Sequence, residues 1–137
     1  MSFLVDTDVL SEPTKLQPSA KAESWLDANQ ALLYTSAITL GELTRGIELL
    51  PAGARRVRME RWLEDVRRTM SGRILAFNSR VAVTWGKLMA QLDREGHRMP
   101  LADSLIAAIA RRHQLTVATR NTQDFARAGI RVVNPFV

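Results

Sequence analysis

The stretch Phe3-Leu4-Val5-Asp6-Thr7-Asp8 runs three apolar residues directly into an acid, a hydroxyl and a second acid. Such an apolar run predicts a short buried strand over residues 3–5. In an open α/β fold, ligands bind at the carboxyl ends of the strands. We therefore expect Asp6 and Asp8 to lie at the ligand-binding edge of a sheet.

The composition is that of a globular chain of modest size. Its 137 residues, 46% of them hydrophobic, suit one core, so residues 1–137 are expected to form a single domain. The absence of cysteine excludes disulfides, thiolate metal sites and cysteine nucleophiles. No apolar run reaches membrane-spanning length and no basic leader opens the chain, so we expect a cytoplasmic protein.

The charge balance is strongly basic. The formal net charge is +5, and 16 of the 19 basic residues are arginine. The planar donor fork of arginine suits phosphate, which favours an anionic partner. Arginine preference also follows from the base composition of a genome, so charge alone leaves both explanations open.

Apolar periodicity predicts strands that alternate with helices along the whole chain. Pro13 is expected to stop the first helix, and Gly72 to cap the helix before it. Alternation of this kind predicts an α/β fold, a five-stranded parallel sheet flanked by helices on both faces. The predicted strands are 3–5, 32–35, 73–77, 116–119 and 130–133, and the predicted helices are 7–12, 19–29, 38–50, 54–71, 79–95, 101–113 and 121–128.

Two connections are longer than a simple crossover requires. Residues 36–72 and 78–115 each contain two predicted helices, whereas a right-handed crossover needs one. In each pair we expect one helix to point away from the sheet. The first pair is predicted to form a projecting arm.

Four acids from distant parts of the chain are predicted to meet at one edge of the sheet. Asp6 follows the first strand, Glu42 lies in the first turns of the helix after the second, and Asp124 opens the helix after the fourth. Asp103 is in the first turn of the helix that leads into the fourth strand, so it reaches the same edge. Asp8 is a possible fifth member.

Each acid also has a purely structural explanation. Glu42 follows Thr39 by three residues, which is the spacing of a capping box, and Asp124 follows Asn121 in the same way. Asp103 suits the positive end of a helix dipole, and Asp6 suits an N-cap. Taken together, however, four carboxylates in one cleft repel one another unless a cation neutralises them.

Hard divalent cations are the ions that such a cluster would bind. Carboxylates bind Mg²⁺ or Mn²⁺, and zinc is disfavoured because neither His97 nor His113 is near the acids in sequence. A metal at a carboxylate cleft on a basic protein points to phosphodiester chemistry. The metal would lower the pKa of a bound water, and arginines would hold the nucleic-acid backbone.

Four segments resemble the PIN domain, and within it the toxin ribonucleases of VapBC toxin–antitoxin pairs. The resemblance covers nearly the whole chain, and the segments are specific in combination rather than singly. The closing Val133-Asn134-Pro135 also fits. The four segments are Leu4-Val5-Asp6-Thr7-Asp8-Val9-Leu10-Ser11-Glu12, Ser36-Ala37-Ile38-Thr39-Leu40-Gly41-Glu42-Leu43, Asp103-Ser104-Leu105-Ile106-Ala107-Ala108 and Ala118-Thr119-Arg120-Asn121-Thr122-Gln123-Asp124-Phe125.

The resemblance implies a Mg²⁺- or Mn²⁺-dependent endoribonuclease, a homodimer, and an antitoxin that covers the site. It implies an RNA substrate, with tRNA and rRNA as candidates. Asp6, Glu42, Asp103 and Asp124 match the acidic quartet of the family as catalytic residues. The expected metal ligands are Asp6, Asp103 and Asp124, with Glu42 and Asp8 as further candidates, and the expected supporting residues are Thr7, Thr119 and Asn121.

Asp8 departs from the family pattern, which often has Asn at this position, so its role as ligand or loop residue stays open. Two other functions also remain. Asp6-Thr7-Asp8 after a strand looks like the nucleophile segment of haloacid-dehalogenase phosphatases, but a late lysine and a Gly-Asp pair are missing. The third reading is a non-catalytic basic RNA-binding module whose acids serve as caps.

Overall fold

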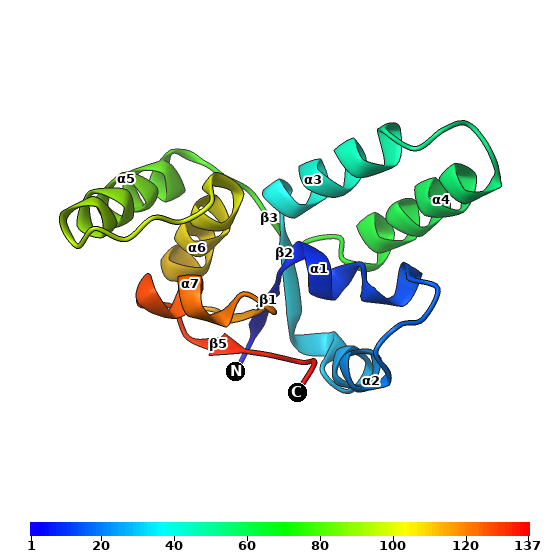
Figure 1. Cartoon of the computed structure of the whole chain (residues 1–137), viewed down its shortest axis with the longest axis horizontal. Helices are drawn as coiled ribbons and strands as arrows, with labels where there is room; N and C mark the ends of the chain where they lie inside the picture. The colour runs from blue at the N-terminus through cyan, green and yellow to red at the C-terminus, as the bar shows by residue number, and fades with distance from the viewer.

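The computed structural model describes residues 1–137 as a parallel sheet with helices on both faces (Figure 1). The sheet has five strands in the order β3-β2-β1-β4-β5, and all neighbouring strands pair in parallel. This confirms the predicted fold class. The strands are β1 (Phe3–Val5), β2 (Leu33–Ser36), β3 (Ile74–Leu75), β4 (Thr116–Ala118) and β5 (Val132–Val133).

Seven α-helices and two short 3₁₀ helices connect these strands. Each predicted helix is present, with ends that shift by a few residues. The α-helices are α1 (Thr7–Leu10), α2 (Ala20–Ala28), α3 (Ala37–Glu48), α4 (Ala54–Thr69), α5 (Ser79–Arg94), α6 (Leu101–His113) and α7 (Thr122–Arg127), and the 3₁₀ helices are η1 (Glu12–Thr14) and η2 (Gln30–Leu32).

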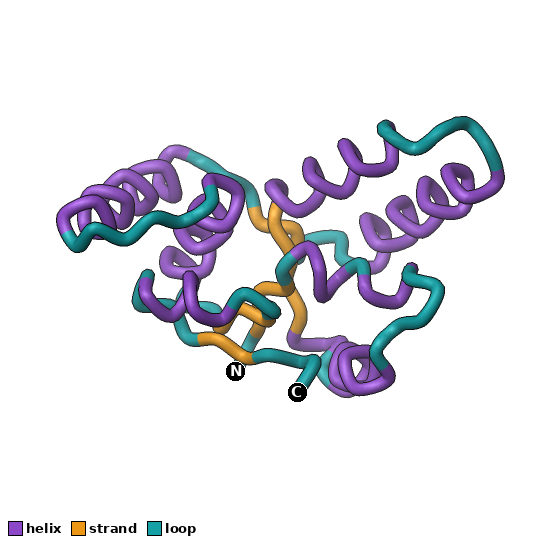
Figure 2. The backbone as a smooth tube through the Cα atoms, in the orientation of Figure 1, coloured by secondary structure: helices purple, strands orange, loops and turns teal.

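The central strand β1 separates two hydrophobic cores because its side chains alternate between the two faces. Leu4 packs into a core formed mainly by α5, α6 and α7. Phe3 and Val5 point the other way, into a core formed with α1, α3 and α4. Figure 2 shows the strands between these two groups of helices. Buried on both sides, β1 fixes the place of the residue that follows it, Asp6.

The predicted arm is present. Helices α3 and α4 pack against each other and extend away from the sheet at the upper right of Figure 1. On the other side, α5 and α6 form a second packed pair, in which Nε1 of Trp85 donates a hydrogen bond to Oγ of buried Ser104 (3.0 Å). This bond and the core contacts beside it fix the N-terminal half of α6, which carries Asp103.

Several predicted boundaries were wrong. The first helix ends at Leu10 rather than residue 12, and Pro13 does not stop it, because proline is compatible with the first positions of η1. The second strand is Leu33–Ser36 rather than 32–35. The third and fifth strands keep only two residues each, since edge strands pair on one side alone.

The two termini lie at the same end of the molecule, below the sheet in Figure 1. None of the helices combines the length and the apolar character needed to cross a lipid bilayer. The division of the chain into one domain stays a prediction.

Candidate active site

Asp6 is the buried centre of the polar edge. It is only 4% exposed, and it is the N-cap of α1, where its Oδ1 accepts a hydrogen bond from the backbone nitrogen of Thr7 (2.8 Å). Its Oδ2 accepts a second bond from Oγ1 of Thr119, at the end of β4 (2.8 Å). Asp6 therefore does cap a helix, as its structural explanation held, but only one of its oxygens serves that purpose.

Asn121 joins two further acids. Its Nδ2 donates to Oδ2 of Asp103 and to Oδ2 of Asp124, both at 2.9 Å. The capping explanation for Asn121 and Asp124 is wrong, because the side chain of Asn121 donates to carboxylates and caps no backbone N–H. Oγ1 of Thr119 accepts a bond from the backbone nitrogen of Asn121 (3.0 Å), so the supports of Asp6, Asp103 and Asp124 form one network.

Glu42 reaches the edge from α3. Its Oε1 accepts a hydrogen bond from Oγ1 of Thr7 (2.7 Å), and its side chain is exposed. The predicted capping box of Thr39 and Glu42 is wrong. The N-cap of α3 is Ser36, whose Oγ accepts from the backbone nitrogen of Thr39 (3.0 Å). Glu42 therefore lies in the second turn of α3, too far from the N-terminus for a role in helix capping.

The acids act on one another electrostatically. Burial is the main cause that raises the pKa of Asp6 to about 6, and the charges of Asp8 and Asp103 raise it further, against the two hydrogen bonds that lower it. Burial also raises the pKa of Asp103, and so do the charges of Glu42, Asp8 and Asp124. The charges of three acids thus raise the pKa of Asp103, whereas those of two raise the pKa of Asp6.

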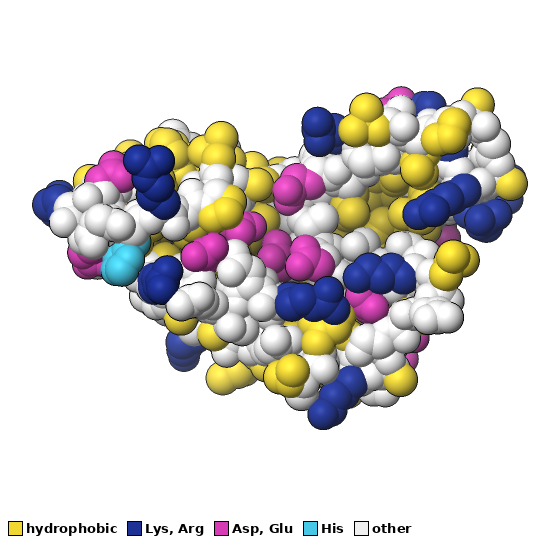
Figure 3. Space-filling model, viewed as in Figure 1, with side chains coloured by type: hydrophobic (Ala, Val, Ile, Leu, Met, Phe, Trp, Pro, Cys, Tyr) yellow, Lys and Arg dark blue, Asp and Glu magenta, His cyan; other side chains and the backbone are white.

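No cation within the chain compensates this charge. The ion pairs of the protein involve Glu12, Glu48, Glu60, Glu64 and Asp65, and none of the clustered acids takes part in one. Figure 3 shows acidic side chains gathered at the middle of one face, with Lys and Arg side chains beside them. The cluster carries negative charge that the protein itself leaves unneutralised.

The donor set suits a hard divalent cation. Every candidate ligand offers carboxylate oxygen, with no sulfur or imidazole among them, and this favours Mg²⁺ or Mn²⁺. No group of three or more acidic or histidine side chains is drawn together closely enough to hold an ion by itself. Mg²⁺ normally keeps several waters and binds through one or two carboxylates, so this looser spacing is compatible with it.

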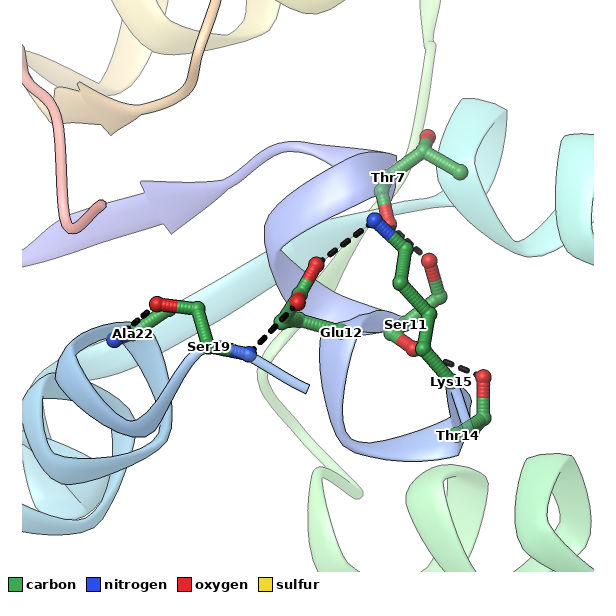
Figure 4. Close-up of polar contacts among 7 residues, drawn as sticks. All are labelled: Thr7, Ser11, Glu12, Thr14, Lys15, Ser19 and Ala22. Carbon is green, nitrogen blue, oxygen red and sulfur yellow. Dashed lines mark hydrogen bonds and ion pairs between the residues drawn. The ribbon is translucent and has the colours of Figure 1, made fainter. Parts of the chain in front are cut away.

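Glu12 is a buried acid for which the sequence predicted no role (Figure 4). It is 2% exposed, its Oε2 accepts from the backbone nitrogen of Ser19 (2.8 Å), and its Oε1 pairs with Nζ of Lys15 (2.7 Å). The bond to Lys15 is the first cause that lowers the pKa of Glu12. Glu12 connects η1 to the start of α2 through its bond to Ser19. In the sequence, only the neighbouring Pro13 indicated a turn here.

A comparison with protein families matches residues 3–130 to the PIN domain. Among curated proteins, the VapC ribonuclease Y4jK of Sinorhizobium fredii is 39% identical, covering 98% of this chain and 97% of its own length. The Toxin FitB of Neisseria gonorrhoeae is also 39% identical, covering 98% of each chain.

Among solved structures, the crystal structure of FitAcB from Neisseria gonorrhoeae superposes with a TM-score of 0.93. Its matching chain is 38% identical, and the match covers 98% of each chain. Sequence and structure agree over almost the full length, including all four acid-bearing segments. The chain therefore belongs to the PIN-domain family, in the group of its VapC-type members.

Proposed function

We propose that this chain is a Mg²⁺- or Mn²⁺-dependent endoribonuclease that hydrolyses RNA phosphodiesters and acts as the toxin of a toxin–antitoxin pair. The ribonuclease and toxin names of its relatives Y4jK and FitB support this function. Its catalytic residues would be Asp6, Glu42, Asp103 and Asp124.

One observation carries the proposal. Acids from four segments meet at the carboxyl edge of the sheet, and the charges of neighbouring acids act together with burial to raise the pKa of Asp6 and Asp103. Such an arrangement costs stability, so it indicates a bound cation rather than a structural role. The alternative capping roles of Glu42 and Asp124 do not account for their hydrogen bonds.

Asp6, Asp103 and Asp124 would hold the metal, with Glu42 and Asp8 as further ligands. When bound, the metal would supply an activated water and stabilise charge on the phosphate oxygens. Thr119 orients Asp6, Asn121 holds Asp103 beside Asp124, and Thr7 orients Glu42. These hydrogen bonds fix the ligands before any cation arrives, which reduces the cost of assembling the site.

A phosphatase that uses Asp6 as nucleophile is not favoured. The lysine that such an enzyme needs is missing from the site. Lys15 pairs with Glu12, and Lys21 and Lys87 lie exposed on α2 and α5.

Three further properties belong to the proposal. We expect a cognate antitoxin protein, encoded elsewhere, to cover the acidic edge, and we expect the chain to act as a homodimer. The structure of a toxin–antitoxin complex from Klebsiella pneumoniae, with a matching chain that is 26% identical and superposes with a TM-score of 0.68, supports a protein partner. Because its substrate would be cellular RNA such as tRNA or rRNA, the proposed place of action is the cytoplasm.

The direct test incubates the purified protein with total RNA in Mg²⁺, in Mn²⁺ or in EDTA, and maps the 5′ ends that appear. Discrete cuts that need a divalent ion and vanish in Asp6→Asn support the proposal. A non-catalytic RNA-binding module would shift RNA in a gel under all three conditions and leave no cuts.

A further inference from the structure

Arg120 lies between Thr119 and Asn121, whose side chains donate hydrogen bonds to the clustered acids. The side chain of Arg120 instead contacts Phe136. Its guanidinium carbon lies 3.7 Å from the ring centroid of Phe136. A planar guanidinium stacks on an aromatic face through both dispersion and cation–π attraction. The ring therefore holds the plane of Arg120 in one orientation.

Phe136 is itself held in place. It follows β5, and its backbone nitrogen donates to Oδ1 of Asn134 (2.9 Å), which closes a turn. Its half-buried ring packs against the core that contains Phe3 and Val5. Phe136 is thus held by packing and by its turn, and it offers an aromatic face to the guanidinium of Arg120.

The donors of Arg120 are all unused. The side chain is exposed, enters no ion pair and donates no hydrogen bond within the chain. Arg56 and Arg73 differ in this respect, because Arg56 pairs with Glu48 and Arg73 donates to backbone carbonyls. Stacking fixes a guanidinium but leaves its in-plane N–H groups free, which is the arrangement that suits a phosphate group.

The backbone of Arg120 lies at the edge that carries the acids, between Thr119 and Asn121. Ala118 of β4 pairs with Val133 of β5, and the backbone nitrogen of Thr119 donates to the carbonyl of Val133 (3.0 Å), so both strands end level with Asp6. The charge of Arg120 is also close enough to lower the pKa of Glu12, after stronger contributions from Lys15 and Ser19. Arg120 is therefore a cation at the rim, outside the acidic cluster.

We propose that Arg120 binds a backbone phosphate of the RNA at the rim of the acidic site, and that Phe136 is the positioning residue that holds its guanidinium for this contact. This inference rests on the proposed ribonuclease function. The acids repel a polyanion, so an RNA strand that approaches them needs a cation beside the cluster. Among the arginines of this edge, Arg120 is the one that a ring holds with its donors free.

The test measures binding of a fluorescent single-stranded RNA to the full chain in EDTA, over a series of salt concentrations. Arg120→Gln is expected to weaken the Kd about tenfold and to make the log Kd against log salt slope shallower by about 0.7, the value for one lost phosphate contact on a single strand. Arg94→Gln is the matched control, because Arg94 is an exposed arginine without an ion pair in the last turn of α5. It should stay within about twofold of wild type.

Phe136 is tested by a conservative pair. Phe136→Leu is expected to weaken the Kd several-fold, whereas Phe136→Tyr retains the ring and should restore it. Arg120→Lys keeps the charge but not the stacked fork, so it should recover the salt slope and only part of the affinity. In Mg²⁺, Arg120→Gln and Phe136→Leu should raise KM with little change in kcat, and thermal unfolding shows whether each variant folds.

Three outcomes overturn the inference. Equal Kd values and slopes for Arg120→Gln and Arg94→Gln would show that Arg120 makes no special contact. A Kd for Phe136→Leu equal to that of wild type would remove the positioning role. A wild-type chain that binds RNA as expected but cleaves none in Mg²⁺ contradicts the ribonuclease function and not this contact, whereas a chain that binds no RNA contradicts both.

Discussion

Oγ1 of Thr119 donates a 2.8 Å hydrogen bond to Oδ2 of Asp6 across 113 residues of sequence. The bond stabilises the ionised form of a carboxylate whose pKa burial raises to about 6. Thr119→Val keeps the shape and removes the donor, so we expect the pKa of Asp6 to rise by about one further unit. An NMR titration of the Asp6 carboxyl group in the metal-free chain measures this change.

Thr119→Ser is the control for this change, because serine retains the hydroxyl. Its titration curve should superpose on that of wild type. An unchanged pKa of Asp6 in Thr119→Val would mean that the hydroxyl does not stabilise the ionised carboxylate.

Asp6 should also limit the stability of the metal-free chain. Because its pKa is raised, the folded chain binds this proton more tightly than the unfolded chain, and stability falls as pH rises from about 4 to about 6. Asp6→Asn is therefore expected to raise the free energy of unfolding in EDTA at pH 7.5 by about 1–3 kcal/mol.

Urea denaturation at a series of pH values measures this effect. The gain should shrink as the pH is lowered towards 4, where Asp6 is protonated in the folded wild type. Asp93→Asn, at an exposed position of α5, should change stability by less than about 0.5 kcal/mol. A destabilised Asp6→Asn at pH 7.5 would mean that the ionised carboxylate supports the fold.

Asn121 should affect the affinity for the metal rather than the stability of the fold. Its Nδ2 is the common donor for Asp103 and Asp124, and loss of such a supporting bond costs metal sites about tenfold or more in affinity. We expect Asn121→Ala to raise the Kd for Mn²⁺ about tenfold in isothermal titration. Gln123→Ala, on the exposed side of the same helix, should leave it unchanged.

The bond between Trp85 and Ser104 should contribute to stability. Ser104 is fully buried, and Ser104→Ala leaves the indole N–H of Trp85 without its partner. The expected loss is about 1–2 kcal/mol in the free energy of unfolding. A double-mutant cycle with Trp85→Phe isolates the bond, and additive losses would show that the two side chains do not interact.

The sequence predicted the fold and the meeting of the acids because both follow from simple rules. Alternating strands and helices require a parallel sheet, and the positions of Asp6 and Asp103 at element ends place them at its carboxyl edge. The prediction for Asp103 depended only on the direction of α6, which the next strand determines.

What the sequence could not predict depends on distant side chains. Thr39 and Glu42 have the spacing of a capping box, but Ser36 takes the N-cap and so moves Glu42 into the second turn. The stacking of Arg120 on Phe136 joins residues that follow different strands, β4 and β5, and no local sequence pattern predicts it. The spacing of residues in the sequence thus predicts candidate contacts, and the packing of the fold determines which of them form.

The central claim is that the clustered acids bind the cation with which this chain cleaves RNA. A substitution of Asp103 tests this claim most directly, because the charges of three other acids raise its pKa. The measurement is single-turnover cleavage of a mapped RNA by metal-free protein as Mg²⁺ is titrated in, for wild type and Asp103→Asn. We predict no cleavage without metal, saturable cleavage by wild type, and a rate at least about a hundredfold lower for Asp103→Asn. Cleavage by wild type in EDTA, or equal rates for the two proteins, would contradict the claim.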